Sequence, residues 1–378
     1  MTEFEQRLSA AQQLLQAEGL DGMLVTHPTN RRYLTGFTAD DIPPDESAGY
    51  LLFTRADAVL VTGSVNVTQA QAQAPHTKVV KRKKSWANSV TKLIQEHRIH
   101  RLGYEPNALL EGVFRQINEQ LNEEGYRLAW FDQSSAIPEM RATKSDAELA
   151  LLRKAFEITV ASFAAVEPTI RAGDTERDVA WRIHSEMVAR GAEGPAFPII
   201  VAAGTNAARP HHEPGETIIV EGEPIVIDMG ARYEGYCADL TRTVWVGDPD
   251  QRLKEVYSVV NGAVEAVLER AHPGLSGGEL DRIARDYIEQ QGYGEAFTHG
   301  LGHGVGLRVH ESPSAGRNVE MTLEPGHTLT IEPGIYLPEW GGVRIEDVIV
   351  FTEDGYEILT SDAEKRRIDE DDDERKGS

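Results

Sequence analysis

Two stretches of the chain decide its fold: residues 227–243 read IDMGARYEGYCADLTRT, and residues 331–346 read IEPGIYLPEWGGVRIE. Each stretch has apolar residues near its ends and turn-forming residues between them, a pattern that predicts a β-hairpin. Each also carries two acidic residues placed symmetrically about its middle. The two stretches therefore predict a pair of equivalent hairpins that present carboxylates.

The spacing predicts how the carboxylates of each hairpin face one another. Asp228 and Asp239 are equidistant from a turn centred between positions 233 and 234, so we expect them to lie directly opposite on one face. Glu332 and Glu346 are likewise equidistant from the middle of the second hairpin. Apolar neighbours make both pairs buried, and buried like charges are costly unless a proton is shared or a cation intervenes.

Convergence of the two hairpins predicts a metal site. If they pack about a pseudo-twofold axis, four carboxylates meet and carry a charge that two divalent cations balance. The segment THGLGHGVGLRVHESP (residues 298–313) adds His299, His303 and His310 among glycines that permit close backbone approach. Imidazole is a common additional ligand in such sites.

The helices that precede the hairpins indicate a duplication. A helix predicted over residues 148–166 and a second one within RAGDTERDVAWRIHSEMVARG (residues 171–191) precede the first hairpin. A helix predicted over residues 253–271 and one within HPGLSGGELDRIARDYIEQQG (residues 272–292) precede the second. Each half thus contains two helices and a hairpin, which predicts a duplicated α+β domain with an antiparallel sheet packed on helices.

The chain is organised in two domains with a charged end. Residues 1–134 alternate helical and strand-like segments and predict a small α/β domain. Residues 135–145 are interpreted as a linker, and the duplicated domain is expected over residues 146–361. Residues 362–378 are mostly charged and are expected to form a disordered tail.

Composition excludes several classes of protein. The 38 Lys and Arg residues against 61 Asp and Glu residues give a formal net charge of −23, which excludes a basic nucleic-acid binder. No run approaches the length of a membrane span, and the first residues have no apolar signal-peptide core, so we expect a cytoplasmic protein. The excess of acidic residues suits either a halophilic, salt-adapted surface or an ordinary acidic cytosolic enzyme.

Together these motifs resemble one family. The resemblance to the prolidase and aminopeptidase P family of metallopeptidases covers the whole chain and rests on several segments. They are NRRYLTGF (residues 30–37), PHH (210–212), the first hairpin, HGLGHGVGLRVHE (299–311), and IEPGIY with GVRIED in the second hairpin. The resemblance implies a creatinase- or prolidase-type α/β N-terminal domain followed by a duplicated "pita-bread" (creatinase/aminopeptidase-like) catalytic domain.

The resemblance also implies roles for particular residues. It places Asp228 on one metal ion, His303 and Glu332 on the other, and Asp239 and Glu346 as bridges between them. Its catalytic and substrate-positioning residues match His211, His299, His310 and Glu332, with Arg344 as a supporting basic residue. We prefer His211 to the adjacent His212 because it directly follows Pro210.

The implied activity is hydrolysis of the Xaa-Pro bond at the N-terminus of dipeptides or short peptides by a metal-bridging hydroxide. Two divalent ions are expected; Mn²⁺ is preferred, and Co²⁺, Fe²⁺ or Zn²⁺ would also bind. The resemblance further implies a homodimer. The alternatives are a non-peptide C–N hydrolase of the same fold, of the ectoine-hydrolase or creatinase type, and a non-catalytic binding module.

The preference for dipeptides or longer peptides stays open. Dipeptide-specific relatives tend to place an arginine shortly after the His-Glu-x-Pro segment, whereas Ser314 and Ala315 follow it in this chain. Arg317 is the nearest substitute. The sequence thus permits both a dipeptidase and an aminopeptidase that acts on longer Xaa-Pro peptides.

Overall fold

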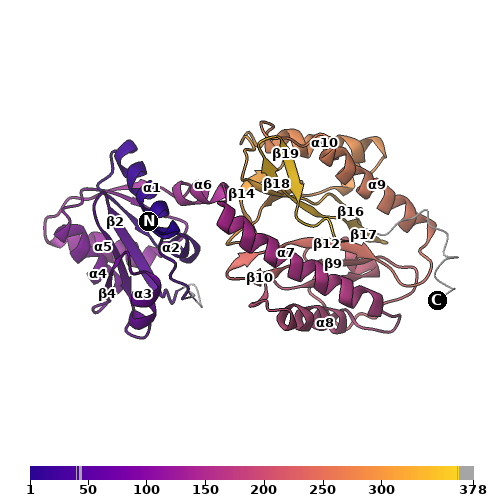
Figure 1. Ribbon diagram of the computed structural model, residues 1–378, viewed down its shortest axis with the longest axis horizontal. Helices are drawn as coiled ribbons and strands as arrows, with labels where there is room; N and C mark the ends of the chain where they lie inside the picture. The colour runs from indigo at the N-terminus through magenta and orange to yellow at the C-terminus, as the bar shows by residue number, and fades with distance from the viewer. Residues whose placement is uncertain (40, 42–44, 364, 366–378) are drawn as a thin grey trace. The chain divides into compact units, whose positions relative to one another are not determined.

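The computed structural model describes residues 1–39, 41, 45–363 and 365. The chain divides into two compact units, Met1–Arg141 and Ala142–Ser378, which we call the N-terminal and C-terminal units and describe separately (Figure 1). Within the described ranges, no helix is long and apolar enough to cross a membrane.

A mixed six-stranded sheet, in the order β4-β3-β2-β1-β5-β6, forms the centre of the N-terminal unit. Its strands are β1 (Gly22–Val25), β2 (Gly49–Thr54), β3 (Ala58–Thr62), β4 (Lys78–Lys81), β5 (Arg101–Tyr104) and β6 (Ala129–Asp132). Its helices are α1 (Glu3–Ala17), α2 (Pro28–Thr35), α3 (Val67–Gln73), α4 (Trp86–Glu96), α5 (Glu111–Glu123) and α6 (Ala136–Ala142). Apolar residues of the strands and of α4 and α5 share one core, so the unit is α/β as predicted.

The first half of the C-terminal unit contains two helices and a set of short strands. The helices are α7 (Asp146–Val166) and α8 (Glu176–Ala189). The strands are β7 (Gly194–Pro195), β8 (Ile200–Ala203), β9 (Ile225–Met229), β10 (Ala231–Tyr233), β11 (Tyr236–Cys237) and β12 (Leu240–Val244), and the short helices are η1 (Glu167–Thr169) and η2 (Gly204–Ala208). Apolar residues of α7 and α8 pack on β8, β9 and β12.

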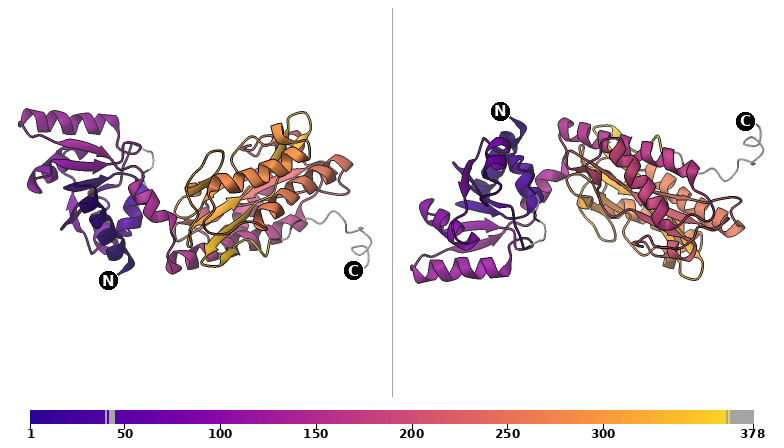
Figure 2. Two further views of the ribbon diagram at one scale, coloured as in Figure 1. Left: turned by 90° about the horizontal axis from the view of Figure 1, so that it is seen from above. Right: turned by 90° about the horizontal axis from the view of Figure 1, so that it is seen from below.

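The second half repeats this arrangement. Its helices are α9 (Gln251–Leu268), α10 (Gly277–Gln290) and the short η3 (Gly294–Ala296). Its strands are β13 (Gly302–Gly304), β14 (Glu311–Ala315), β15 (Thr328–Ile331), β16 (Gly334–Leu337), β17 (Gly341–Arg344), β18 (Asp347–Thr352) and β19 (Gly355–Ile358). The view from above shows α9 and α10 in front of the strands, and the view from below shows α7 and α8 in front (Figure 2).

Equivalent helix starts confirm the duplication. Thr175 caps α8 and Ser276 caps α10, each with a reciprocal capping box. Gly173 and Gly274, two residues before these caps, both have the left-handed conformation, with φ of 95° and 98°. The same local chemistry therefore begins the second helix of each half.

Hydrogen bonds join the two hairpins side by side. The Glu346 backbone N–H donates to the Thr241 carbonyl at 3.1 Å, which links the second hairpin to β12. The Arg344 N–H donates to Thr243 Oγ1 at 3.1 Å, and the Thr243 hydroxyl donates to the Arg344 carbonyl at 2.8 Å. These bonds bring the acidic residues of the two halves together.

At two of the predicted domain boundaries, residues belong to a helix or form specific contacts. The predicted linker at 135–145 contains α6, which ends where the two units divide. At the start of the predicted tail, Ala363 is buried and its carbonyl accepts a 2.8 Å hydrogen bond from Arg242. Lys365 forms a 2.6 Å ion pair with Asp347. Residues 364 and 366–378 of the predicted tail lie outside the described residues.

Candidate metal centre

The first hairpin has a different register from the predicted one. Asp228 pairs with Thr241, two residues beyond Asp239, so the prediction that Asp228 and Asp239 are directly opposite is wrong. The turn is centred one residue later than expected, because Glu234 and Gly235 both adopt positive φ, 44° and 82°. Such a pair forms the two-residue turn that matches strand twist. A shift of two residues keeps side chains on the same face, so Asp228 and Asp239 are diagonal neighbours.

The second hairpin has the predicted register. Ile331 pairs with Asp347 and Gly334 pairs with Arg344, and this register places Glu332 opposite Glu346 between the two ladders. The prediction for this pair is confirmed.

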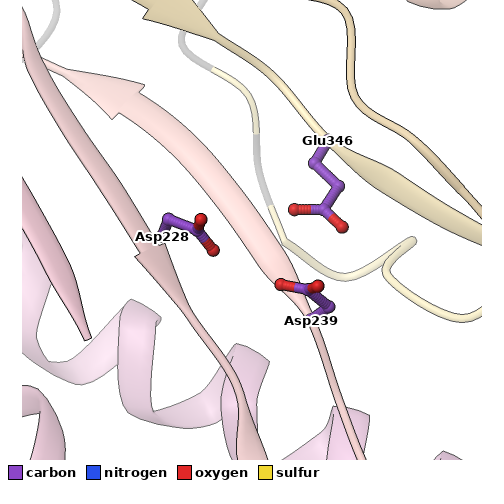
Figure 3. A group of neighbouring side chains, drawn as sticks. All are labelled: Asp228, Asp239 and Glu346. Carbon is purple, nitrogen blue, oxygen red and sulfur yellow. The ribbon is translucent and has the colours of Figure 1, made fainter. Parts of the chain in front are cut away.

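Three of the four carboxylates form one compact group. Oxygen atoms of Asp228, Asp239 and Glu346 lie within 4.8 Å of one another, and Figure 3 shows the three side chains pointing toward a common space. His303 and Glu332 adjoin this group: His303 Nε2 is 3.1 Å from Glu332 Oε1 and 3.8 Å from Asp239 Oδ2. The structure therefore brings together all five residues predicted as metal ligands.

Glycine permits the approach that places His303. A Cβ added at Gly302 would lie 1.9 Å from the Thr330 carbonyl oxygen, so only glycine allows β13 to pack this closely on β15. Thr330 Oγ1 then accepts from the His303 N–H at 2.9 Å and donates to Glu332 Oε1 at 2.8 Å. His303 Nδ1 lies 3.2 Å from the Gly304 carbonyl, so a proton on Nδ1 leaves Nε2 free to coordinate a cation.

Two buried oxygen atoms of this group show that it fits a cation. Among the described residues, Asp228 Oδ1 and Glu346 Oε1 are buried and have no hydrogen-bond partner. Buried carboxylate oxygens normally accept hydrogen bonds, because an unsatisfied one costs about 1–3 kcal/mol. A set of four carboxylates and one imidazole supplies ligands for divalent cations, which would satisfy these atoms.

The pKa values of the clustered carboxylates reflect the mutual repulsion of their charges. Burial, reinforced by the charges of neighbouring carboxylates, raises the pKa values of Asp239 and Glu346 well above their ordinary range. Burial also raises the pKa of Glu332, but the hydrogen bond and charge of His303 reverse this effect and lower it to about 2. Asp239 and Glu346, which face other carboxylates, thus carry the largest electrostatic cost.

Arg344 connects the carboxylates to their surroundings. Its guanidinium is buried and donates to Asp228 Oδ2 at 2.7 Å and to Thr241 Oγ1 at 3.2 Å. It also donates to the Tyr336 hydroxyl at 3.0 Å and to the Pro210 carbonyl at 3.3 Å. The predicted supporting residue therefore contacts a candidate ligand directly.

The three candidate histidines differ in their partners. His299 Nε2 lies 2.9 Å from the Tyr336 hydroxyl, a contact that the sequence analysis did not anticipate although Tyr336 belongs to the IEPGIY motif. His310 is exposed, and its ring centroid is 4.1 Å from that of His303. His211 is exposed and lies within electrostatic range of His310.

His212 has a structural partner that sequence reasoning missed. Its Nε2 lies 2.8 Å from Oε2 of Glu176, a carboxylate at the start of α8 that is fully buried. The two residues are separated by 36 positions, and no local pattern in the sequence signals the contact.

The chain belongs to metallopeptidase family M24, whose family pattern matches residues 150–353. Residues 7–143 match the Creatinase/Prolidase N-terminal domain. These matches confirm the predicted family, its class of metal-dependent hydrolases, and the α/β N-terminal domain followed by a duplicated pita-bread domain.

The relatives include Xaa-Pro peptidases of similar length. The chain is 36% identical over 348 residues to the Xaa-Pro dipeptidase of Pyrococcus horikoshii, which covers 92% of this chain and 95% of the relative. It superposes on the structure of an Xaa-Pro dipeptidase from Bacillus anthracis with a TM-score of 0.89 and 35% identity, covering 97% and 99% of the two chains. An X-Pro aminopeptidase structure from Thermotoga maritima gives a TM-score of 0.84 with 34% identity, covering 94% and 97%.

Proposed function

We propose that this protein is a dinuclear-metal peptidase that hydrolyses the Xaa-Pro bond at the N-terminus of dipeptides or short peptides. The observation that carries the proposal is the compact acidic group in which Asp228 Oδ1 and Glu346 Oε1 are buried without a hydrogen-bond partner among the described residues. The Xaa-Pro activity named for relatives that match nearly the whole chain supports the substrate class.

Five residues would hold the metal ions. We assign Asp228 to one ion, His303 and Glu332 to the other, and Asp239 and Glu346 as bridges. When bound, two divalent ions activate water at neutral pH and polarise the scissile carbonyl. Mn²⁺ is the proposed metal because oxygen ligands predominate, and Co²⁺, Fe²⁺ or Zn²⁺ would also bind.

The remaining residues would move protons and position the substrate. Glu332 would accept the proton of the attacking water, and its orientation is fixed by Thr330, which donates to Oε1 at 2.8 Å. His310 is exposed beside His303, and His211 is exposed within electrostatic range of His310, so either would donate to the substrate carbonyl oxygen or to the leaving nitrogen. His299 and Arg344 would support this arrangement through their shared contact with the Tyr336 hydroxyl.

A dedicated enzyme suits the bond before proline. The proline nitrogen carries no hydrogen and the ring fixes φ near about −65°, so a site that grips an extended backbone through that N–H cannot use it. The proposed mechanism instead acts on the carbonyl group, which this bond retains.

The substrate test uses purified protein, Mn²⁺ and three peptides: Ala-Pro, Ala-Pro-Ala and Ala-Ala-Ala. We expect free alanine from Ala-Pro and none from Ala-Ala-Ala. Release from Ala-Pro-Ala as well would identify an aminopeptidase acting on longer peptides. No release from either proline peptide by metal-loaded protein would contradict the proposed function.

Three further properties complete the proposal. The protein is a homodimer in the cytoplasm, where the single buried Cys237 stays reduced. Its net charge of −23 supports adaptation to high salt, in which carboxylate repulsion is screened. Size-exclusion chromatography with light scattering tests the dimer, and maximal stability below about 0.2 M salt would contradict the halophilic surface.

A further inference from the structure

The carboxylate of Glu176 lies fully buried at the first residue of α8 and accepts four hydrogen bonds. Oε1 accepts from the Ala203 N–H and from Asn206 Nδ2, both at 2.9 Å. Oε2 accepts from the Gly215 N–H at 3.0 Å and lies 2.8 Å from His212 Nε2. Every lone-pair direction of this carboxylate is therefore used.

All four donors belong to one segment, residues 203–215, which we call the His211 loop. The loop begins at Ala203, the last residue of β8, and continues through η2, after which residues 209–215 form no strand. Glu176 thus binds both ends of the loop, at Ala203 and Gly215, and two side chains within it. A single carboxylate therefore holds the loop at four points along its length.

The other side of the loop packs against the metal-site hairpin. Arg344 donates to the Pro210 carbonyl at 3.3 Å, directly before His211. A Cβ added at Gly342 would lie 2.3 Å from the Ala207 carbonyl oxygen, so β17 and the loop are in close backbone contact. The position of His211 is therefore set between Glu176 and the candidate metal centre.

The second half of the duplicated unit holds its histidine segment with different residues. Asp281 accepts from the Leu301 N–H at 3.0 Å, and Arg285, paired with Asp281, donates to the carbonyls of Phe297 and His299 at 2.9 and 2.8 Å. In both halves, the second helix presents a buried carboxylate that fixes a segment bearing a candidate histidine. This recurrence favours a functional role for the Glu176 contact.

We infer that Glu176 is a positioning residue that orients His211 for the reaction, with His212 as one of its anchors. The inference rests on the proposed function. It explains why two adjacent histidines differ in role: His212 faces Glu176, whereas His211 is exposed and lies within electrostatic range of His310.

The test compares Glu176→Gln with Glu216→Gln, an exposed neighbouring glutamate that pairs with Arg177. Gln keeps the size of Glu176 but turns one acceptor into a donor, so two of the four donors lose their partner. We expect kcat for Ala-Pro to fall about 100-fold, the effect of misplacing a reacting group by about 1 Å, with KM and bound metal unchanged. Amide hydrogen exchange should accelerate in the His211 loop, and Glu216→Gln should match the wild type in both measurements.

A double variant separates positioning from general damage. If Glu176 acts through His211, then Glu176→Gln combined with His211→Ala should lose no more activity than His211→Ala alone. Losses of kcat that multiply in the double variant would overturn the inference. Wild-type kcat and wild-type hydrogen exchange in Glu176→Gln would overturn it as well. If that variant does not fold, Asn206→Ala, which removes one donor and keeps the charge, is judged by the same criteria.

Failure of the proposed function is recognised separately. Wild-type protein that releases no alanine from any Xaa-Pro peptide contradicts the proposed function, whatever the variants do. Hydrogen exchange in the His211 loop still tests the inference in that case, because it reports the Glu176 contact without turnover. Unchanged exchange in Glu176→Gln would overturn it.

Discussion

Two groups of buried carboxylates in the C-terminal unit have opposite environments. Glu176 accepts four hydrogen bonds, and although burial raises its pKa, these bonds together lower the pKa below its ordinary value. Asp239 and Glu346 are also buried but face other carboxylates, and their pKa values are raised well above the ordinary range. The partners of a buried carboxylate, and not its burial alone, therefore determine its pKa and its role.

This difference distinguishes a carboxylate that fixes a loop from carboxylates that would bind a cation. Glu176 is satisfied by the protein itself, so it fixes structure without any cation. The metal-site carboxylates leave Asp228 Oδ1 and Glu346 Oε1 without a partner among the described residues, and a divalent cation would satisfy both. Substitutions in the two groups should consequently have opposite effects on the stability of the metal-free protein.

The largest effect is expected at the bridging carboxylates. Asp239→Ala or Glu346→Ala should lower kcat for Ala-Pro by at least about 10³-fold, because each removes a proposed ligand of both ions and their electrostatic stabilisation. The measurement is single-turnover and steady-state kinetics at saturating Mn²⁺. Retained turnover in either variant would show that the acidic group is not the reaction centre.

The adjacent histidines sharpen the comparison within the His211 loop. His211→Ala should reduce kcat by about 10²- to 10³-fold, the range expected for a lost proton donor. His212→Gln retains a donor for Glu176 and should cost less than about 10-fold. The measurement is kcat and KM of both variants under the same conditions. A larger loss of kcat in the His212 variant would reverse the two assignments.

In the presence of a chelator, substitutions in the two groups should change the free energy of unfolding in opposite directions. Glu176→Gln leaves buried donors without a partner and should lower the free energy of unfolding by about 2–3 kcal/mol. Asp239→Asn removes a repelling charge and should raise it by up to about 1 kcal/mol. Urea unfolding monitored by circular dichroism compares both variants with the wild type. A similar loss of unfolding free energy in both variants would contradict the distinction between the two groups of carboxylates.

The smallest effect is a pH dependence. The pKa of Glu176 is lowered in the folded state from an ordinary 4.5, so its ionised form stabilises the fold above that value. This stabilisation is lost as pH falls through the folded-state pKa. The difference in unfolding free energy between wild type and Glu176→Gln should therefore be constant near neutral pH and shrink below pH 4.5. A difference that grows on acidification would contradict the lowered pKa.

The two hairpins show how far sequence symmetry predicts structure. Counting outward from the middle placed Glu332 opposite Glu346, as the register confirms. The same count misplaced Asp228 by two residues, because the first turn is set by the positive φ values of Glu234 and Gly235 and not by the centre of the acidic spacing. Side chains alternate every two residues, so the error left the convergence of the acids intact.

The contacts that sequence reasoning missed are long-range. Glu176 meets its donors 27 to 39 residues away, and Tyr336 meets His299 across 37 residues. No local periodicity encodes such contacts, because they arise only when helices and hairpins pack. The four candidate carboxylates were predictable because their residue type and symmetric spacing carry the chemistry, and the family resemblance selected His303 among the three histidines. The residues that orient these ligands are defined by tertiary structure.

The most direct test of the central claim is the number of metal ions bound per chain. Protein freed of metal, equilibrated with Mn²⁺ by dialysis and analysed by plasma mass spectrometry, should bind about two ions per chain. Glu176→Gln should bind the same number, whereas Asp239→Ala and Glu346→Ala should bind fewer. Wild-type protein that binds no Mn²⁺, Co²⁺, Fe²⁺ or Zn²⁺, or bridging-residue variants that bind as much as the wild type, would contradict the account.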